Sequence, residues 1–364
     1  MKKIYFQLGG MYVGGVEKAF LGLLTTLPRN EYEVHVGFIG SSDGYIKMLP
    51  EYVNVHWVDC YKPMKSLIND PPLYSVRNLL KQGHVFDAIV YFLLSVHYKM
   101  TKGRYWFYQY MMRNVPVESE QYDIAVAFAG PSQMIDYYVC KKIRAKKKYG
   151  WIHFDVTKFG IDVPMTRKLY RVYEKIFIVS ETAKEKFDGM FPEFKKKTVV
   201  RYNVVPHEQI VRLADDGDSF NDDFKGKRIL TVGRISTEKG QDVAIDALKI
   251  LLDRGFDVRW YFIGEGVSLQ SCKDKVERLG LTDNVRFLGV RLNPYPYMKD
   301  CDVYVQPSRH EGYCITLAEA RCFAAPIVAT CFTGAEEQLK TFPKSVVTGM
   351  SAEDMANGIQ SYLI

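Results

Sequence analysis

The sequence predicts an α/β protein built from two doubly wound parallel sheets. Short apolar segments typical of strands alternate with segments typical of helices along most of the 364 residues. The alternation stops at the polar, acidic stretch LADDGDSFNDDF (213–224) and then starts again. Because strand–helix–strand units build parallel sheets, each half of the chain predicts a sheet of its own. A length of 364 residues also exceeds the usual size of one domain. We therefore expect domains at 1–205 and 206–364.

The first half begins with a strand expected over KIYFQL (3–8). Two glycine pairs, Gly9-Gly10 and Gly14-Gly15, separate this strand from the helical pattern VEKAFLGLLTTL. Residues 61–122 fit the alternation poorly and are predicted to be mostly helical. The other strands expected in this half are 33–39, 54–58, 123–128, 148–153 and 175–180.

The second half predicts a regular series of strands and helices. Its expected strands are 228–232, 257–263, 285–288, 302–306 and 327–330, and its expected helices are 242–252, 272–279, 316–322 and 354–363. Ligands of doubly wound sheets bind beyond the carboxyl ends of the strands. With two such sheets, the expected site is the cleft between the halves.

Composition limits the class of protein. The seven cysteines are odd in number and form no CxxC pair, which argues against a disulfide framework or a zinc site and favours a reducing cytoplasm. The apolar run in MKKIYFQLGG is too short for a signal peptide. The most apolar window, IVYFLLSV (89–96), is too short to span a bilayer. We expect a cytoplasmic protein that is either free or attached to the inner face of the plasma membrane.

Charge is distributed unevenly along the chain. Residues 1–205 hold 30 Lys and Arg against 19 Asp and Glu, whereas residues 206–364 hold 19 against 23. The resulting charges of +11 and −4 indicate that the first half meets an anionic partner. Two segments, RYWFYQYMMR (104–113) and KKIRAKKK (141–148), are either a packed core and a solvated face or a contact with an anionic membrane surface. Nucleic acid is not expected, because the second half is acidic and no nucleic-acid-binding module is present.

The segment SRHEGYCITLAEA (308–320) predicts a ligand site. It joins an expected strand to an expected helix through a glycine turn, so free backbone N–H groups are available to a phosphate. Glu311 and Glu319 bracket this turn, and carboxylates suit hydroxyl groups. The pattern therefore indicates a ligand with both phosphate and sugar.

A second loop, in TVGRISTEKGQD, carries two cations. Arg234 and Lys239 follow an expected strand and precede an expected helix. They are either ordinary surface charges or the groups that neutralise a diphosphate leaving group. Their position in the same half as Glu311 favours the second interpretation.

Taken together, these motifs resemble glycosyltransferase family 4, a family of retaining enzymes with the GT-B fold that use nucleotide sugars. The resemblance is carried by VGRISTEKG, FIGEG (262–266), VRFLGV (285–290), YVQPSRHEGYCITLAEA (304–320) and PIVAT (326–330). It implies two Rossmann-like domains facing across a cleft, with 1–205 binding the acceptor and 206–364 binding the nucleotide-sugar donor. The first half resembles the family more loosely, through Gly14 to Glu17 and through His153.

The resemblance implies roles for residues of the second half. Arg234 and Lys239 contact the donor diphosphate, Glu319 binds the ribose, and Glu311 lies beside the donor sugar as a positioning group. The Cys314 thiol is assigned no chemistry. The donor-binding backbone is that of Gly312, Tyr313, Cys314 and Ile315.

Three residues of the first half are implied as well. Gly15 lets its loop approach the donor closely. His153 lies near the anomeric carbon and completes a catalytic set with Glu311, Arg234 and Lys239. Asp155 is a weaker candidate for orienting the acceptor.

The expected reaction moves a sugar from a nucleoside diphosphate sugar, with UDP or GDP favoured, to a hydroxyl of a glycan or lipid-linked glycan. We expect no metal and no other cofactor, because Asp300-Cys301-Asp302 directly precedes a strand, where Asp is an ordinary turn residue. The alternatives are a sugar-nucleotide epimerase, a phosphorylase and a non-catalytic partner of another glycosyltransferase. A dinucleotide-linked dehydrogenase is disfavoured, since no GxGxxG motif follows the first strand. The base, the sugar and the acceptor are not predicted.

Overall fold

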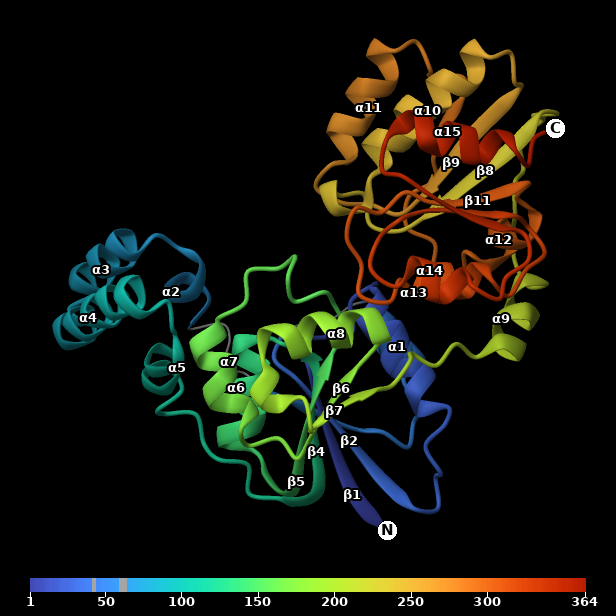
Figure 1. Ribbon diagram of the computed structural model, residues 1–364. Helices are drawn as coiled ribbons and strands as arrows, with labels where there is room; N and C mark the ends of the chain where they lie inside the picture. The colour runs from blue at the N-terminus through green and yellow to red at the C-terminus, as the bar shows by residue number, and fades with distance from the viewer. Residues whose placement is uncertain (41–43, 59–63) are drawn as a thin grey trace. The chain divides into compact units, whose positions relative to one another are not determined.

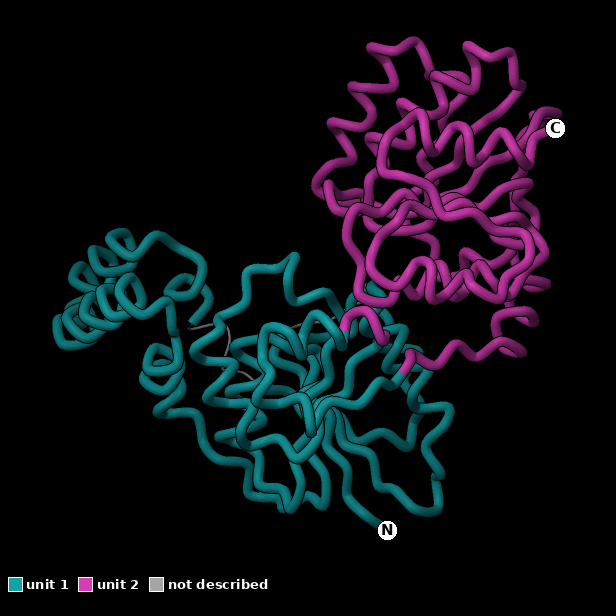
Figure 2. Tube along the Cα trace, in the orientation of Figure 1, with its two compact units in different colours: residues 1–179, 184–201 teal, residues 180–183, 202–364 magenta. Residues whose placement is uncertain are grey.

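A computed structural model describes residues 1–40, 44–58 and 64–364. The chain forms two compact units, which Figure 2 distinguishes by colour. Unit 1 consists of residues 1–179 and 184–201, and unit 2 consists of residues 180–183 and 202–364. Each unit is described separately below.

Unit 1 contains a seven-stranded sheet in the order β3-β2-β1-β4-β5-β6-β7, and every pair of neighbours is parallel. The strand order reverses beside β1, so the crevice between β1 and β4 is the topological switch point at which such sheets bind ligands. The strands are β1 Lys2–Leu8, β2 Tyr32–Phe38, β3 Asn54–Trp57, β4 Gln121–Gly130, β5 Arg144–Ile152, β6 Lys175–Ile178 and β7 Thr198–Val200.

The core of unit 1 lies between this sheet and its helices (Figure 1). Phe6 of β1, Phe20 of α1 and Phe128 of β4 meet edge to face, with ring centroids 5.2–6.0 Å apart. The helices associated with the sheet are α1 Gly15–Leu24, α6 Gln133–Lys142, α7 Val163–Tyr170 and α8 Glu181–Met190, of which the first three residues of α8 belong to unit 2.

The expectation of a mostly helical segment over 61–122 is confirmed for the residues from 64 onward; residues 61–63 lie outside the described part. The helices are α2 Lys65–Asn69, α3 Pro72–Lys81, α4 Val85–Thr101 and α5 Tyr105–Met111. Within unit 1, α3 and α4 pack against each other as a helical hairpin that projects beside α5 (Figure 1).

Unit 2 repeats the plan with six parallel strands in the order β10-β9-β8-β11-β12-β13. Here the order reverses beside β8, so the switch point lies between β8 and β11. The strands are β8 Lys227–Val232, β9 Val258–Ile263, β10 Val285–Phe287, β11 Val303–Gln306, β12 Ile327–Thr330 and β13 Ser345–Thr348. The helices are α9 His207–Ala214, α10 Gln241–Asp253, α11 Leu269–Arg278, α12 Tyr295–Asp300, α13 Ile315–Ala320, α14 Ala335–Leu339 and α15 Ala352–Gln360. The predicted α/β class with two doubly wound sheets is confirmed.

Two edge strands were not predicted. β7 has three residues and β13 has four, so neither is long enough to show the alternation or apolar run that marks a strand in sequence.

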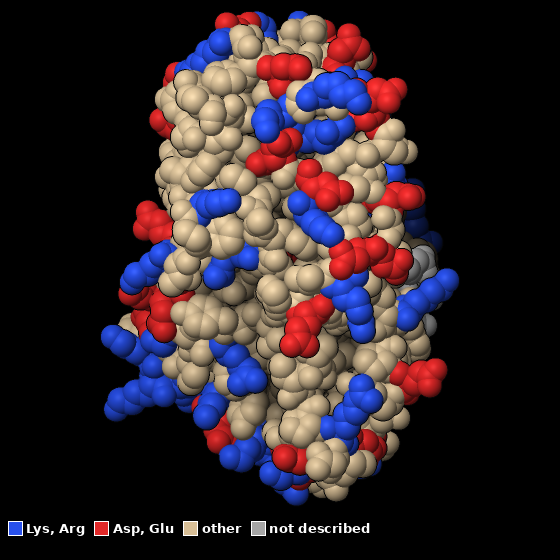
Figure 3. All heavy atoms as spheres, turned by 90° about the vertical axis from the view of Figure 1, so that its right-hand side faces the viewer, with Lys and Arg blue, Asp and Glu red and all other residues tan. Residues whose placement is uncertain are grey.

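The basic run 141–148 was left open as a solvated face or a membrane contact, and Lys141, Arg144, Lys146 and Lys147 are exposed. β5 begins at Arg144, so much of the run is strand. Lys146 pairs with Asp123 at 2.6 Å, Lys147 pairs with Glu174 at 2.9 Å, and the Lys148 ammonium donates to the Cys140 carbonyl at 2.9 Å. These three of its six cations are therefore engaged within unit 1. On the face drawn in Figure 3, Lys and Arg are likewise interspersed with Asp and Glu.

The acidic stretch 213–224 is anchored to unit 2. Asp222 accepts hydrogen bonds from Tyr261 at 2.5 Å, Arg259 at 2.9 Å and Arg228 at 3.1 Å. These donors hold the pKa of Asp222 at about 2, against the opposing effect of burial. Within the described residues, no helix is both long and apolar enough to cross a membrane.

Candidate active site

The two loops singled out in the second half leave neighbouring strands at the switch point of unit 2. β8 ends at Val232 and β11 ends at Gln306, and the two strands pair directly, with Ile229 opposite Val303. Because parallel strands present their carboxyl ends at one edge of the sheet, loops 233–240 and 307–314 lie side by side there. This places Arg234, Lys239 and Glu311 at one site.

Two glycines allow this close approach. Gly240 has φ +71°, and a Cβ at this position would lie 2.0 Å from the Pro307 carbonyl oxygen of the other loop. A Cβ at Gly266, in the FIGEG motif, would lie 2.2 Å from the Ile235 oxygen and 3.0 Å from Cγ of Arg234. Larger residues would separate the loops or displace Arg234.

Lys239 and Glu311 form an ion pair in which Nζ lies 2.5 Å from Oε1. The Ser308 hydroxyl donates to the same carboxylate oxygen at 2.7 Å and accepts from the Gln306 amide at 2.8 Å. Burial alone would lower the pKa of Lys239, but the Glu311 charge outweighs it and keeps that pKa above its ordinary value. Lys239 is therefore cationic at neutral pH.

Arg234 adds a second cation on the same loop. Its carbonyl oxygen accepts from the Gln241 side-chain amide at 2.9 Å, which ties the loop to the first turn of α10. The residue is exposed, and the ion pairs found among the described residues do not include its guanidinium. It is thus free to meet an anion.

A clamp that the sequence analysis missed joins the two loops. Arg309 donates to both oxygens of Asp242 at 2.7 Å and to the Thr237 carbonyl at 2.6 Å. Such bidentate pairs fix orientation as well as distance. The sequence does show Arg309 close to Glu311, but it does not show that Arg309 pairs with Asp242, which lies 67 positions away in the chain.

Glu319 is buried on α13, separate from Glu311. Its Oε1 accepts from the Tyr295 hydroxyl at 2.8 Å, so the first residue of α12 orients the carboxylate. Tyr295 was not predicted as a site residue. The structure therefore gives the two glutamates different neighbours: Lys239 and Ser308 for Glu311, and Tyr295 for Glu319.

The backbone of Gly312, Tyr313, Cys314 and Ile315 leads into α13. Cys314 has φ +53°, a left-handed conformation that non-glycine residues rarely adopt. Its thiol is buried, with Thr316 Oγ1 3.5 Å away, and burial raises the pKa of this thiol well above its ordinary value. A thiol held protonated is a poor nucleophile, in agreement with the expectation that it carries no chemistry.

In unit 1, Gly15 is the exposed first residue of α1, at the carboxyl edge of the sheet. His153 directly follows β5, with its ring stacked on Trp151 at 5.9 Å and 4.6 Å from the Phe128 ring. Its ring nitrogens are buried and make no hydrogen bond to a side chain that the structure describes, and the Phe128 backbone only partly offsets the effect of burial on the pKa of His153. Burial lowers the pKa of His153 to about 3, so the imidazole is neutral at physiological pH.

This environment predicts that His153 does not titrate between about pH 5 and 8, unlike an ordinary histidine. The measurement is an NMR titration of protein labelled at histidine, with the His153 signal assigned by its loss in His153→Gln. A chemical shift for His153 that does not change over this range is expected. A titration midpoint near the ordinary histidine value would contradict the buried, uncharged environment.

Asp155 is an internal anchor. Its carboxylate accepts from the Thr157 backbone N–H at 2.9 Å, the Thr157 hydroxyl at 2.6 Å and the Lys186 ammonium at 2.6 Å. These contacts tie the segment after His153 to α8. The role in orienting an acceptor stays a prediction.

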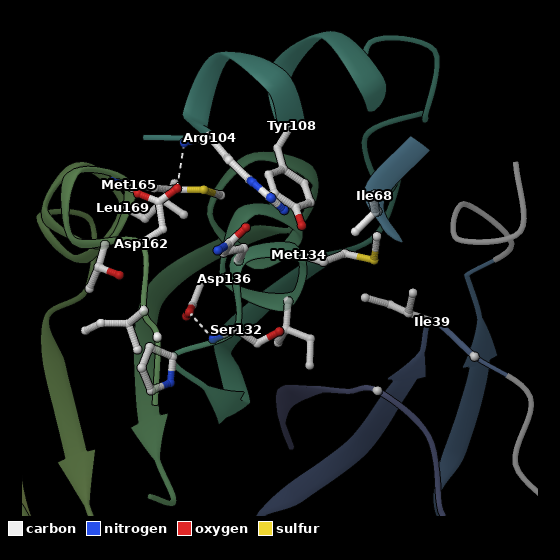
Figure 4. A pocket seen from close by; sticks show the side chains of 18 of the residues that line it. Ile39, Ile68, Arg104, Tyr108, Ser132, Met134, Asp136, Asp162, Met165 and Leu169 are labelled. Atoms are coloured by element: carbon white, nitrogen blue, oxygen red, sulfur yellow. Dashed lines mark hydrogen bonds between the residues drawn. The ribbon is translucent and has the colours of Figure 1, made fainter. Parts of the chain in front are cut away.

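Unit 1 also contains a cavity of about 470 Å³ at its own switch point, with Gly9 after β1 and Ser132 after β4 in its wall (Figure 4). Most of its lining is apolar, including Ile39, Ile68, Tyr108, Met134, Met165 and Leu169. Such a mixture of apolar walls and few polar groups is typical of ligand pockets.

The cavity's two acids are engaged, while its cation faces the interior. Asp136 accepts from Ser132 N and Tyr173, and burial raises the pKa of this carboxyl to about 7. Asp162 caps α7 and accepts from the Arg104 backbone N–H at 2.6 Å. The Arg104 guanidinium points into the cavity beside Tyr108 in Figure 4 and joins no ion pair within the described residues. The sequence analysis named Arg104 only as the first residue of the segment 104–113.

One group of side chains has the composition of a metal site. His35, His56 and Glu120 lie together in unit 1, yet His35 Nδ1 is 2.8 Å from His56 Nε2. That is a hydrogen-bonding distance, whereas two nitrogens around a tetrahedral zinc would be about 3.3 Å apart. In unit 2, the Asp302 carboxylate of the DxD-like sequence accepts from the Arg228 N–H and the Lys227 ammonium at 2.9 Å.

Residues 217–364 match the family of glycosyl transferases group 1. This part of the chain is a group 1 glycosyl transferase domain. An uncharacterised glycosyltransferase of Methanocaldococcus jannaschii is 25% identical over 47% of this chain and 43% of that protein. The mannosylfructose-phosphate synthase of Agrobacterium fabrum is 34% identical over 30% of this chain and 27% of that protein. The chain thus spans less than half the length of these curated relatives.

Solved glycosyltransferase structures share the fold of the whole chain. The Anabaena protein Alr3699/HepE in complex with UDP-glucose superposes with a TM-score of 0.66 at 17% identity, covering 99% of this chain and 89% of that one. A Staphylococcus aureus TarM mutant in complex with UDP has a TM-score of 0.68 at 12% identity, covering 100% and 93%. The match over residues 217–364 confirms the family resemblance, and the likenesses to solved structures confirm the GT-B fold.

Proposed function

We propose that this protein is a retaining glycosyltransferase. It moves a sugar from a nucleoside diphosphate sugar to a hydroxyl of a glycan or lipid-linked glycan, in the synthesis of a cell-surface polysaccharide or glycolipid. The observation that carries the proposal is the Lys239–Glu311 pair beside Arg234, at the switch point of a group 1 domain. Two cations at the carboxyl edge of a doubly wound sheet suit a diphosphate.

In this reaction the bond between the anomeric carbon and the diphosphate oxygen breaks, and the acceptor oxygen bonds to the same carbon. Arg234 and Lys239 stabilise the negative charge that grows on the departing diphosphate. The acceptor proton passes to the departing phosphate oxygen, so no protein base is needed. Glu311 orients Lys239 and the donor sugar, since its Oε1 already accepts from Lys239 and Ser308. Glu319, oriented by Tyr295, receives the ribose hydroxyls.

Named relatives support the donor and acceptor classes. Alr3699/HepE has been solved with UDP and glucose, which favours a UDP-sugar here. The amylovoran biosynthesis glycosyltransferase AmsD of Erwinia amylovora is 26% identical over 52% of each chain, which favours a polysaccharide acceptor. The six cysteines in the described part of the chain are free thiols, which supports a cytoplasmic location.

We assign the unit 1 cavity to the acceptor. Its apolar walls and the Arg104 guanidinium suit an amphiphilic molecule with an anionic group, such as a phosphate next to a lipid or sugar ring. The neutral ring nitrogens of His153 are suited to hydroxyl groups. Asp155 acts through the loop that follows His153 and does not need to contact substrate.

Arg104→Ala is expected to raise KM for the acceptor by about 10- to 100-fold, because a hydrogen-bonded ion contact in a pocket contributes about 1.5–3 kcal/mol. KM for the donor should not change. Steady-state kinetics with each substrate varied in turn provides the test. Arg113→Ala is the matched control, since Arg113 is exposed, pairs with Asp87 and does not line the cavity. Unchanged acceptor KM in Arg104→Ala would remove the cavity from the acceptor site.

The proposed function is tested in two stages. A thermal-shift panel of UDP-, GDP- and ADP-sugars identifies the donor, because a specific ligand stabilises the folded state in proportion to its occupancy. Transfer to glycan and lipid-linked acceptors is then measured with and without a metal chelator, and equal rates are expected. Turnover of the donor without any acceptor would indicate an epimerase. Tight binding without turnover on any acceptor would indicate a non-catalytic partner.

A further inference from the structure

The α3–α4 hairpin of unit 1 exposes an apolar stripe, formed by Phe86, Ile89, Leu93, Val96 and Met100 of α4. The spacing of three and four residues places all five on one face of the helix. Each is exposed, with Phe86 at 73%, Leu93 at 60% and Met100 at 80%. A continuous apolar face of this kind on a protein surface indicates a binding surface.

The opposite face of α4 accounts for the packing of the hairpin. Tyr91 is buried, donates to the Leu67 carbonyl at 2.8 Å and packs against Phe107 of α5. Asp87 accepts from Tyr110 of α5 at 2.5 Å and pairs with Arg113 at 2.9 Å. The stripe is therefore the side of α4 that the fold of unit 1 leaves uncovered.

α3 also exposes apolar and basic side chains. Leu73, at 74% exposure, Tyr74 and Leu80 lie on its solvent side together with Arg77 and Lys81. Tyrosine and the long lysine and arginine chains suit a boundary between an apolar and an aqueous phase.

The charge of the hairpin is strongly biased. Residues 72–102 contain four basic residues and a single acidic one, Asp87, which gives a net charge of +3. All four basic residues are exposed, and none belongs to an ion pair between described residues. They are Arg77, Lys81, Lys99 and Lys102.

We propose that the hairpin binds the surface of an anionic lipid bilayer, with the stripe in the apolar layer and these four cations at the headgroups. This inference stands on the hairpin alone and does not depend on the proposed transfer reaction. Lipid phosphates complement the charge, and buried apolar area adds to the affinity. A dimer formed through two hairpins is disfavoured, because it would bring together two surfaces that each carry a net charge of +3. With 17 residues and an inner face that packs against α5 through Asp87 and Tyr91, α4 suits a position in the interface plane.

This location differs from the two segments for which the sequence analysis left a membrane contact open. Of the segment 104–113, Phe107, Tyr108 and Met112 are buried in unit 1, and Lys168 covers the Trp106 ring at 4.2 Å. In the run 141–148, three of the six cations, at positions 146–148, are engaged within unit 1, as described above. The hairpin is a further exposed surface that suits a membrane, which charge patterning alone did not reveal.

The test is co-sedimentation of the full chain with vesicles of phosphatidylcholine containing about one-third phosphatidylglycerol. We expect binding that weakens with salt and is lost on pure phosphatidylcholine. Phe86→Ser/Leu93→Ser should reduce the partition coefficient by about 100-fold, because two large apolar side chains no longer leave water. Replacing the four cations by glutamine should remove the preference for anionic vesicles.

Val267→Ser/Leu292→Ser is the matched control, because both side chains are exposed and apolar but belong to unit 2. It should bind vesicles like the wild type. Circular dichroism and thermal unfolding check that all variants fold. Absence of vesicle binding by the wild type would overturn the proposal. So would a dimer in sedimentation analysis that Phe86→Ser/Leu93→Ser dissociates, because the stripe would then bind a second copy.

Discussion

Lys239→Ala is expected to reduce kcat by about 100- to 1,000-fold, with the donor identified by the thermal-shift panel. The lysine is held 2.5 Å from Glu311 and remains charged, so it stabilises the diphosphate without reorganisation as the bond breaks. Loss of a preorganised group of this kind costs about 2.7–4 kcal/mol of transition-state stabilisation. Initial-rate measurements of nucleoside diphosphate release give the effect directly.

Two further variants make the result specific to Lys239. Lys249→Ala removes a half-buried lysine of α10 whose ammonium pairs with Asp253, so its kcat should equal that of the wild type. Glu311→Gln combined with Lys239→Ala should cost less than the sum of the single changes, because the residues interact directly. Strict additivity would show that the pair does not act as a unit in turnover.

Glu319→Ala is expected to weaken nucleoside diphosphate binding by about 10- to 100-fold. The reason is the loss of hydrogen bonds from the ribose hydroxyls to a charged acceptor, which contribute about 1.5–3 kcal/mol. Titration calorimetry with a nucleoside diphosphate and its 2′,3′-dideoxy analogue isolates this contribution. The wild type should prefer the natural ligand, whereas the variant should bind both with similar affinity.

Because Glu319 is buried, its loss can also affect folding. Tyr295→Phe provides the second variant, since it keeps the carboxylate and removes the hydroxyl that orients it at 2.8 Å. Its effect on affinity should be smaller and in the same direction. Glu277→Ala, an exposed glutamate of α11, should change nothing. If Glu319→Ala still bound the natural ligand more tightly than the dideoxy analogue, by the same factor as the wild type, the ribose would have to bind elsewhere.

The donor loops were predictable because their chemistry is local in sequence. A strand, a glycine turn and a helix start lie within 13 residues of each other around Glu311, and the same holds around Lys239. The strand order then brings the two loops together, because β8 and β11 are neighbours. What the sequence could not show was which oxygen of Glu311 is engaged, or that Tyr295 orients Glu319.

Features built from distant segments were not predicted. The Arg309–Asp242 clamp joins residues 67 positions apart, and the unit 1 cavity combines segments from Gly9 to Leu169. The hairpin stripe was hidden for another reason. Its residues are apolar, and only the folded structure separates the buried Tyr91 from the exposed Leu93 on the same helix. Burial, not composition, distinguishes a core face from a binding face.

The central claim is that the edge of unit 2 between β8 and β11 binds the donor diphosphate. The most direct measurement is titration calorimetry of the nucleoside diphosphate and of the corresponding nucleoside, on the wild type and on Arg234→Ala/Lys239→Ala. The wild type should bind the diphosphate at least about tenfold more tightly than the nucleoside, because hydrogen bonds to charged groups supply 1.5–3 kcal/mol each. The double variant should lose this difference while binding the nucleoside unchanged. A diphosphate advantage of the same size in both proteins would contradict the account.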